Sequence, residues 1–189
     1  MSDEVPGLCR RAREGDVEAA SRLVTLFHRR VYAYFARLCA VEDAEDLTEK
    51  TFFKVWTSMA KYEERSSFAT WIHSIAHHVY VDWRRKRNPM EAQSPEWWEA
   101  LASAEPNPFE SVAERDLASR LYRLVDTLDA ETRELVHLHY YQHLSIAEVS
   151  EALDIATSTV KYRLRQALDF LRSRAVEPHL QTTHPIQNR

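Results

Sequence analysis

The scarcity of glycine limits this chain more than any other feature of its sequence. Gly7 and Gly15 are the only two glycines among its 189 residues, and both lie near the N-terminus. Tight β-hairpins need Gly or Asn-Gly at positions of positive φ, and the body of the chain offers neither. The sequence therefore predicts an all-α protein, and its 44% of apolar residues are enough to build a core.

Two helices are expected in the first third of the chain. Asp16 is placed to cap a helix that runs to about Leu38, after a stretch 1–14 that is either poorly ordered or a short helix. A second helix is expected over 42–60, and five acids and one lysine crowd the segment 41–50. Acids in a first turn complement the helix dipole, but this number exceeds what capping needs. A docking face for a basic partner is an interpretation of at least equal weight.

A longer helix is expected from the caps Ser66 and Ser67 to about Arg87. Helical spacing places one apolar face on Phe68, Trp71, Ile72, Ile75, Ala76, Val79 and Trp83. The polar residues that lie away from this face are Thr70, His73, His77 and Arg84. The basic run Arg84–Arg87 suits the C-terminus of a solvated helix, and it also suits a DNA backbone contact.

The stretch 144–172 is typical of two helices joined by a tight turn. Ser145 and Glu148 have the spacing of a capping box, and Asp154 stands where the chain must turn. Either Thr157 or Ser158 can cap the second helix, whose outer face is polar and basic. An ordinary helical hairpin shares these features. The agreement of capping, turn and charge favours a helix-turn-helix whose second helix enters a DNA major groove.

Composition divides the chain into two helical domains. Residues 89–111 are rich in proline and acids and contain no basic residue, which is typical of a linker. The expected parts are an N-terminal tail 1–15, a helical domain 16–88, the linker 89–111, a helix-turn-helix domain 112–174 and a C-terminal tail 175–189. Cys9 and Cys39 fit no CxxC pattern and are expected to be reduced thiols in a cytosolic protein. No apolar run is long enough to cross a bilayer.

From about Asp16 to Arg174, the chain resembles the extracytoplasmic-function (ECF) sigma factors, the smallest promoter-specificity subunits of bacterial RNA polymerase. Three stretches carry the resemblance. They are Asp43–Trp56, similar to the family's helix that binds core polymerase; Ser66–His78 with Asp82–Arg87, similar to the helix that opens and reads the −10 element; and Leu144–Arg172, similar to the helix-turn-helix that reads the −35 element.

The resemblance implies two small helical domains, sigma2-like and sigma4-like, on a flexible acidic linker. It implies a cytoplasmic RNA polymerase sigma factor that binds core polymerase and recognises both promoter elements to initiate transcription of a stress- or signal-responsive regulon. The protein would be held by an anti-sigma factor, make no membrane contact of its own, perform no catalysis, and need neither a cofactor nor a metal. The acidic linker would thread through the polymerase.

The family's motifs assign three sets of residues in this sequence. The implied contacts with core polymerase are Asp43, Asp46, Leu47, Glu49 and Phe53. The implied −10 contacts are Tyr62, Ser66, Ser67, His73, His77, Arg84, Arg85 and Arg87. The implied −35 contacts are Thr157, Ser158, Thr159, Lys161, Tyr162, Arg163 and Arg165. A flipped base of the −10 strand would need an apolar wall with polar edges, for which Tyr62, Ser66 and Phe68 are the nearest candidates.

The chain departs from the family's pattern at several positions. Ala69 stands where the family usually has Arg, Asp154 replaces a common turn Gly, and Asp169 puts an acid late on the DNA side of the second helix. Glu49-Lys50 replaces a usual Gln-Glu pair, and His77-His78 stands where Arg-Asn is frequent. Because imidazole changes charge between pH 5 and 8, His77 is expected to make strand opening pH-dependent.

Three other functions were weighed against this interpretation. Histidine is a common metal ligand, and the chain has two groups of histidines: His73, His77 and His78, and His137, His139 and His143. No Cys or acid stands in a matching third position for either group. A regulator with a helix-turn-helix output would need a ligand pocket or a phosphoacceptor domain, and the N-terminal half shows the pattern of neither. No glycine-rich phosphate loop, HExxH or GxSxG motif indicates an enzyme.

Overall fold

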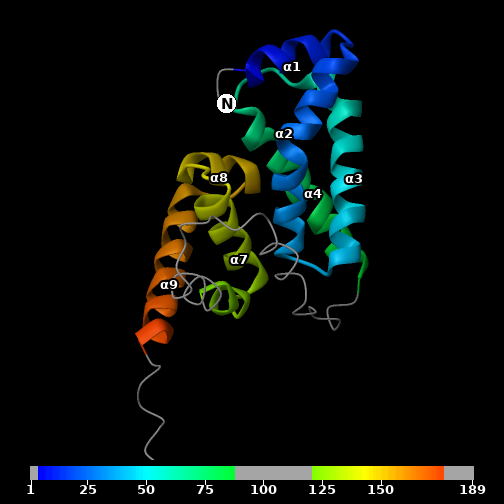
Figure 1. Ribbon diagram of the computed structural model, residues 1–189. Helices are drawn as coiled ribbons and strands as arrows, with labels where there is room; N and C mark the ends of the chain where they lie inside the picture. The colour runs from blue at the N-terminus through cyan, green and yellow to red at the C-terminus, as the bar shows by residue number, and fades with distance from the viewer. Residues whose placement is uncertain (1–3, 88–120, 177–189) are drawn as a thin grey trace, which may run out of the picture.

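The computed structural model describes residues 4–87 and 121–176, and within these two ranges all regular structure is helical. The N-terminal half holds α1 (Val5–Arg13), α2 (Val17–Ala36), α3 (Val41–Ser58), the 3-10 turn η1 (Met59–Lys61) and α4 (Phe68–Lys86). The C-terminal half holds helical residues 121–126, α7 (Ala130–Val136), the π-helical turn η2 (His137–Tyr141), α8 (Ile146–Leu153) and α9 (Thr157–Val176). Figure 1 shows the two halves side by side. The helices of both described ranges confirm the all-α prediction.

The corner between α1 and α2 depends on Gly15, whose φ of +92° lies in the region that favours glycine. Asp16 then caps α2, because its Oδ1 accepts the backbone N–H of Glu18 at 2.9 Å and of Ala19 at 3.1 Å. The side chain of Arg11 donates to the same carboxylate at 2.7 Å. The predicted cap is confirmed, and the stretch before it forms the short helix α1.

One apolar core holds α1–α4 together. The predicted apolar face of α4 is confirmed at Phe68, Ile72, Ala76 and Val79, which are buried against α2 and α3. The rings of Phe27 and Phe68 meet edge to face with centroids 4.9 Å apart, a favoured geometry for aromatic pairs. Cys9 and Cys39 are buried free thiols whose pKa values burial raises to about 12, so both stay protonated at neutral pH.

The helix-turn-helix of α8 and α9 forms as the sequence predicts. Ser145 and Glu148 make both bonds of the capping box, and Asp154 adopts the left-handed conformation with φ 51° and ψ 47°. One expectation is wrong. The first α-helical bond of α9 runs from the amide of Val160 to the carbonyl of Ala156 at 3.1 Å, so Ala156 occupies the cap position. Thr157 and Ser158 therefore lie in the first turn rather than at the cap.

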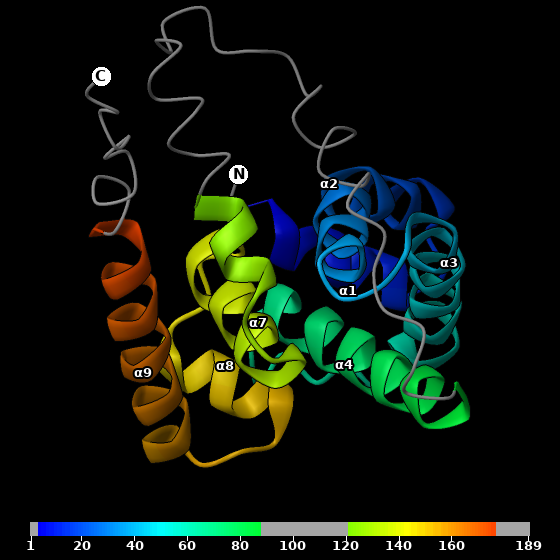
Figure 2. The ribbon, with the colours of Figure 1, turned by 90° about the horizontal axis from the view of Figure 1, so that it is seen from below.

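The two halves pack along a seam that we define as the contact of α2 and α4 with α7, η2 and α8. Figure 2 shows α4 running from α3 toward α7 and α8, and α4 packs directly on α8. Helix α9 lies on the outer side of α7 and α8 in both views, away from α4. The seam therefore decides which faces of the two halves stay open.

Several expectations fall outside the described residues. They are the linker 89–111 with Trp97 and Trp98, the start of the C-terminal helices near Val112, and most of the tail 175–189. In the part of the chain that the structure describes, no helix is both long and apolar enough to cross a bilayer.

Candidate nucleic-acid and polymerase interface

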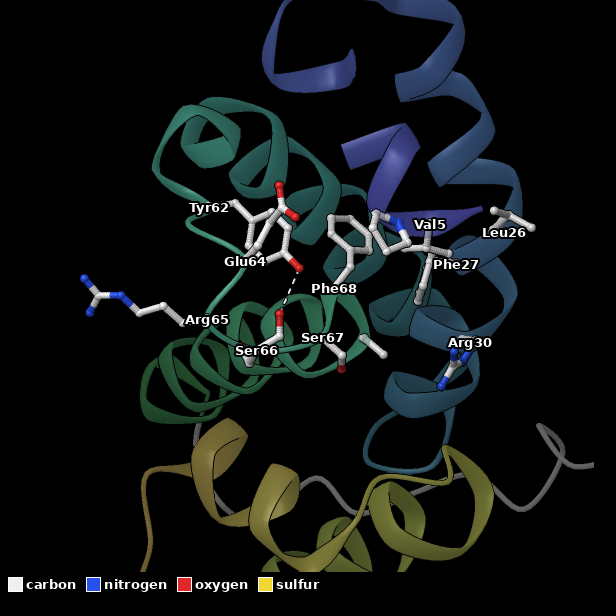
Figure 3. A pocket seen from close by; sticks show the side chains of 12 residues that line it. Val5, Leu26, Phe27, Arg30, Tyr62, Glu64, Arg65, Ser66, Ser67 and Phe68 are labelled. Carbon is white, nitrogen blue, oxygen red and sulfur yellow. Dashed lines mark hydrogen bonds between the residues drawn. The ribbon is translucent and has the colours of Figure 1, made fainter. Parts of the chain in front are cut away.

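The loop before α4 borders a cavity of about 550 Å³ (Figure 3). Tyr62, Phe68 and Phe27 supply an aromatic wall, while Arg30, Glu64, Arg65, Ser66 and Ser67 supply polar edges. The hydroxyl of Tyr62 donates to the carbonyl of Ser66 at 2.9 Å, which fixes the ring against the loop. Burial, followed by the charges of Cys9 and Glu64, raises the pKa of Tyr62 to about 12, so the phenol remains a donor.

The cavity brings together Tyr62, Ser66 and Phe68, the residues suggested for a flipped base, but the rings of Tyr62 and Phe68 are only 6% and 2% exposed. An aromatic wall can stack on a nucleic-acid base, and polar groups at the rim can bond its edge. Ala69 also lines the cavity, at the position where the family usually has Arg. The small side chain of Ala69 leaves this part of the wall without a cation of its own.

The polar stripe of α4 lies differently from the prediction. His73 was expected to face outward, but its side chain is 0% exposed, and its Nδ1 bonds the carbonyl of Ala69 at 2.7 Å. The reason is that η2 and α2 cover it, since the rings of His73 and His137 both lie within about 6 Å of the ring of Tyr34. Burial, opposed by the Ala69 bond and assisted by Arg30, lowers the pKa of His73 to about 4. His73 is therefore neutral at physiological pH.

The basic end of α4 is only partly free. Arg84 and Arg85 are exposed, and Arg85 pairs with Asp82 at 3.6 Å. Arg87 donates to Asp43 of α3, which also accepts from the indole N–H of Trp83 at 3.3 Å. Arg87 and Asp43 thus join α4 to α3, so both predicted contact residues are engaged inside the N-terminal half.

Glutamates of the C-terminal half meet the polar stripe of α4 at three levels. Oε1 of Glu148 accepts from the hydroxyls of Ser67 and Thr70, each at 3.1 Å. Oε1 of Glu134 lies 2.7 Å from Nδ1 of His77 and also accepts the Tyr34 hydroxyl. Oε1 of Glu131 lies 4.0 Å from Nη2 of Arg84, a weaker contact.

A further polar contact closes the seam next to the cavity. The Arg30 side chain donates to Gln142 twice, to its side-chain oxygen at 3.0 Å and to its carbonyl at 2.8 Å. The amide of Gln142 donates back to the carbonyl of Arg30 at 3.1 Å. Sequence reasoning missed Tyr34, Glu134 and Gln142, because no local pattern marks a polar residue whose partner lies on another helix.

The outer face of α9 is open. Thr157, Ser158, Lys161, Tyr162 and Arg165 are exposed, Thr159 and Arg163 are partly exposed, and Tyr162 is 62% exposed. The side-chain amide of Gln166 donates to the Tyr162 hydroxyl at 2.6 Å, and Arg163 pairs with Glu131 at 2.6 Å. Ser158, Lys161, Tyr162 and Arg165 therefore share the outer side of α9, Thr157, Thr159 and Arg163 flank it, and Val160, Leu164 and Ala167 are buried beneath it.

An acidic stripe runs along the outer face of α3. Asp46 and Glu49 are exposed, and Phe53 extends the stripe with a ring that is 70% exposed. Lys50 pairs with Asp46 at 3.7 Å, which partly offsets the charge. The expectation that Leu47 makes an external contact is wrong, because its side chain is buried in the core. Asp46, Glu49 and Phe53 thus remain as the accessible part of the predicted set.

The histidine groups do not assemble in the way that a metal site requires. His77 bonds Glu134, His78 bonds the carbonyl of Ser74 at 2.6 Å, and His139 bonds the carbonyl of Leu144 at 2.8 Å. Among residues 4–87 and 121–176, no three His, Cys, Asp or Glu side chains are grouped so as to hold a metal ion.

Comparison with known proteins identifies the family. Two family descriptions match the chain, Sigma-70 region 2 over residues 23–89 and Sigma-70 region 4 over residues 118–171. The chain is 31% identical over 176 residues to the ECF RNA polymerase sigma factor SigE of Mycolicibacterium smegmatis, covering 90% of this chain and 68% of that relative. It is 30% identical over 179 residues to the ECF sigma factor SigK of Mycobacterium sp. strain JLS, covering 92% and 91% of the two chains. The chain belongs to the ECF RNA polymerase sigma factors.

Solved structures agree with this fold. CnrH, solved in complex with the cytosolic domain of CnrY, superposes with a TM-score of 0.64 at 20% identity, over 89% of this chain and 94% of that one. The sigma factor RpoE of Bartonella quintana, solved with the anti-sigma factor NepR, gives a TM-score of 0.63 at 21% identity, over 83% and 97%. As a sigma factor, the protein is a transcription initiation factor and not an enzyme: the polymerase that it binds supplies the catalysis.

Proposed function

We propose that this sigma factor uses three surfaces to start transcription. The outer face of α9 reads the −35 element, the cavity before α4 takes a base of the −10 strand, and the acidic stripe of α3 docks on core polymerase. The open, polar and basic face of α9 carries the most weight, because an exposed helix of this kind fits the DNA major groove.

Residues of α9 divide by chemistry into two roles at the −35 element. Lys161, Arg163 and Arg165 can hold phosphates or the acceptor atoms of guanine, and Thr157, Ser158, Thr159 and Tyr162 can reach base edges. Phosphate contacts set the position of the helix on DNA, whereas base contacts carry the sequence preference.

At the −10 element, the cavity and the basic end of α4 have complementary tasks. Ser66 and Ser67 offer hydrogen bonds at the rim of the cavity, and the buried rings of Tyr62 and Phe68 form its floor. Arg84 and Arg85 are placed to hold the duplex backbone near the C-terminus of α4. His77 lies between these two regions and would take part in strand opening once Glu134 releases it.

Docking on core polymerase would rest on charge and one aromatic anchor. Asp46 and Glu49 complement a basic surface, and Phe53 supplies an exposed ring of the type that dominates interface energies. An anti-sigma factor that covers such surfaces is the expected antagonist, since family members are commonly controlled in this way. Because its proposed partners, polymerase and promoter DNA, are in the cytoplasm, we expect the protein there as well.

The decisive experiment is reconstitution of the holoenzyme. Core polymerase with the full-length chain should give run-off transcripts and protect both promoter boxes in a footprint. The double variant Asp46→Lys/Glu49→Lys should weaken core binding, with the larger loss at low salt. Glu14→Lys/Glu18→Lys, which reverses two exposed acids near the α1–α2 corner, is the matched control and should bind as the wild type does. Equal binding by both double variants at every salt concentration would exclude the acidic stripe.

A further inference from the structure

The loop between η1 and α4, residues 62–67, forms one side of the cavity. Its two ends are fixed by local hydrogen bonds. The Tyr62 hydroxyl donates to the Ser66 carbonyl at 2.9 Å, a bond that Figure 3 shows crossing the loop, and the side chain of Ser67 caps α4. Neither bond involves Glu64, which lies at the tip of the loop, so the tip needs a restraint of its own.

Glu64 has a backbone conformation that its residue type does not favour. Its φ is +56°, in the left-handed region that only a few per cent of non-glycine residues adopt. Within residues 4–87 and 121–176, the other non-glycine residues with positive φ are His143 and Asp154. Their residue types are enriched in this region, whereas Glu is not. A conformation of this kind persists only where the surrounding contacts determine it.

Two arginines of α1 supply contacts of this kind. Nη1 of Arg13 lies 3.5 Å from Oε1 of Glu64, and Nη1 of Arg10 lies 3.9 Å from Oε2, so each carboxylate oxygen faces one cation. Both arginines belong to the basic last turn of α1, and the same helix buries Leu8 and Cys9 in the core. The cations therefore stand on a fixed support, from which they reach the tip of the loop.

The other charges of the loop are not used in this way. Glu63 and Arg65 pair with each other at 2.5 Å, and their side chains are 61% and 84% exposed. The side chain of Glu64 is 31% exposed, so the contact with α1 is less open to solvent. Helix α1 also lines the cavity directly with Val5 and Pro6. Helix α1 thus contributes to the wall of the cavity and to the fixing of its loop.

We propose that α1 is a positioning element for −10 recognition, in which Arg13 and Arg10 hold Glu64 so that the loop presents Ser66 and Ser67 to the captured base. This inference rests on the proposed role of the cavity at the −10 element. Hydrogen bonds to a base edge depend on the placement of their donors and acceptors. A loop with a free tip spends part of its time in other conformations, and the affinity for the correct base falls with that fraction. Glu64 acts through the loop and makes no contact with DNA.

The test uses holoenzyme formed from core polymerase and the full-length chain. The probe is a fragment of a promoter that this holoenzyme transcribes, with the −10 non-template strand unpaired and each −10 base replaced in turn. Fluorescence anisotropy gives a Kd for each fragment, and the ratio of the Kd values for the replaced and the native base measures discrimination at that position. The ratio cancels any uniform change in affinity that a lost or gained charge causes.

Ser66→Ala, which alters the rim of the cavity, identifies the position that the cavity reads. Arg13→Gln and Glu64→Gln should each lower discrimination at that position about threefold, the value of one partly exposed ion pair. Discrimination at the other positions should stay the same. Arg29→Gln removes an exposed arginine of α2 and is the matched control, which should discriminate as the wild type does. Unchanged binding of core polymerase reports that the N-terminal half of each variant is folded.

Double variants test the pair itself. Arg13→Gln/Glu64→Gln should lose no more discrimination than Glu64→Gln alone, because both substitutions remove the same contact. Glu64→Arg places a third cation beside the two arginines and should lose discrimination as well. The exchanged pair Arg13→Glu/Glu64→Arg restores opposite charges and should recover most of the loss. A role of either residue in stability alone would not change discrimination at one base and then restore it by exchange.

Three results would overturn the proposal. If Ser66→Ala lowers discrimination and the Arg13 and Glu64 variants do not, the loop keeps its shape without α1, while the role of the cavity stands. If Arg13→Gln weakens binding of every fragment equally, Arg13 holds a phosphate and not the loop. If Ser66→Ala changes discrimination at no position, the assignment of the cavity to the −10 element fails, and the positioning role of α1 fails with it.

Discussion

The two helices proposed to contact the promoter, α4 and α9, differ in what surrounds their polar faces. On α9, Lys161, Tyr162 and Arg165 stand exposed on a helix whose other side is buried in its own half. On α4, the equivalent stripe holds a histidine with no exposed surface and a second histidine bonded to a buried glutamate. One helix has an open polar face, and the polar face of the other is covered by side chains of the C-terminal half.

The difference teaches that a polar helix face is not by itself a solvent face. Both stripes have the composition of a solvated or DNA-binding surface, and only tertiary contacts separate them. Thr70 and His77 find hydrogen bonds across the seam, whereas buried His73 bonds the carbonyl of Ala69 in its own helix and its Nε2 has no hydrogen-bond partner. A covered stripe and an open stripe should therefore respond differently to pH, mutation and salt.

Acid should produce the largest effect, and it should act on the covered face. The pKa of His73 is about 4 in the folded protein and about 6.5 in an unfolded chain. The unfolded state therefore binds a proton that the folded state refuses, so stability is lost as pH falls from about 6.5 to 4. The loss for His73 alone is about 3 kcal/mol at pH 4.

His137 adds to this loss in the same direction. Burial, followed by the charges of Arg37, His73 and Arg30, lowers its pKa well below the ordinary value. Urea unfolding of the full chain between pH 7.5 and 4 measures the slope, and His73→Leu should flatten it. His78→Gln, an exposed histidine of the same helix, is the control and should leave the slope as it is. A wild-type stability that does not change over this range would show that His73 is not held neutral.

The second effect belongs to the open face. Arg165→Ala should weaken binding of the free chain to the −35 duplex by about 2 kcal/mol, or about 30-fold, if Arg165 reads a base. Point changes in the −35 box show which base is concerned, because the variant loses discrimination at that position only. A phosphate contact would instead lower affinity for all sequences alike. An unchanged upstream footprint would remove Arg165 from the interface.

Sequence patterns predicted the open face better than the covered one, for a physical reason. The caps Asp16, Ser67 and Ser145 and the left-handed Asp154 act within a few residues of themselves, so local chemistry decides them. The same holds for α9, whose buried and exposed sides follow one helical period.

The seam could not be predicted in this way. His77 and Glu134 are 57 positions apart, and Tyr34 and Glu134 are 100 apart, with the proposed linker between them. Nothing in a helical period says that a polar stripe will meet another half of the same chain. For this reason His73 was expected to face outward, and Tyr34 and Gln142 were passed over.

A third effect concerns His77 in the holoenzyme. His77→Ala should lower the reactivity of −10 thymines to permanganate about fivefold, the value of one hydrogen bond of about 1 kcal/mol. Binding of the closed complex should change less. Lowering the pH from about 8 to 6.5 should help the wild type more than the variant, because only an imidazole gains charge in this range. His78→Ala is the control, and equal reactivity of His77→Ala and wild type at both pH values would make α4 a scaffold with a basic end.

The smallest effect connects the two faces. Glu131 lies between them, 2.6 Å from Arg163 of α9 and 4.0 Å from Arg84 of α4, with all three side chains partly exposed. Surface ion pairs of this kind are worth about 0.5 kcal/mol. Glu131→Gln should therefore release Arg163 for a phosphate and raise affinity for the −35 duplex about twofold. High salt should abolish the gain, because screening weakens the pair and the phosphate contact alike.

Glu131→Gln and Glu134→Gln make a matched pair on one helix that separates the two faces. Removal of the exposed charge should alter −35 binding most, with a smaller effect on −10 binding through Arg84, whereas removal of the buried charge should alter −10 binding alone. Anisotropy titrations of both variants with a −10 non-template strand and a −35 duplex give the four values needed. If Glu131→Gln also raises −10 affinity as much as Glu134→Gln does, the covering of α4 is a general effect of negative charge. The buried bonds of Glu134 would then have no special part in it.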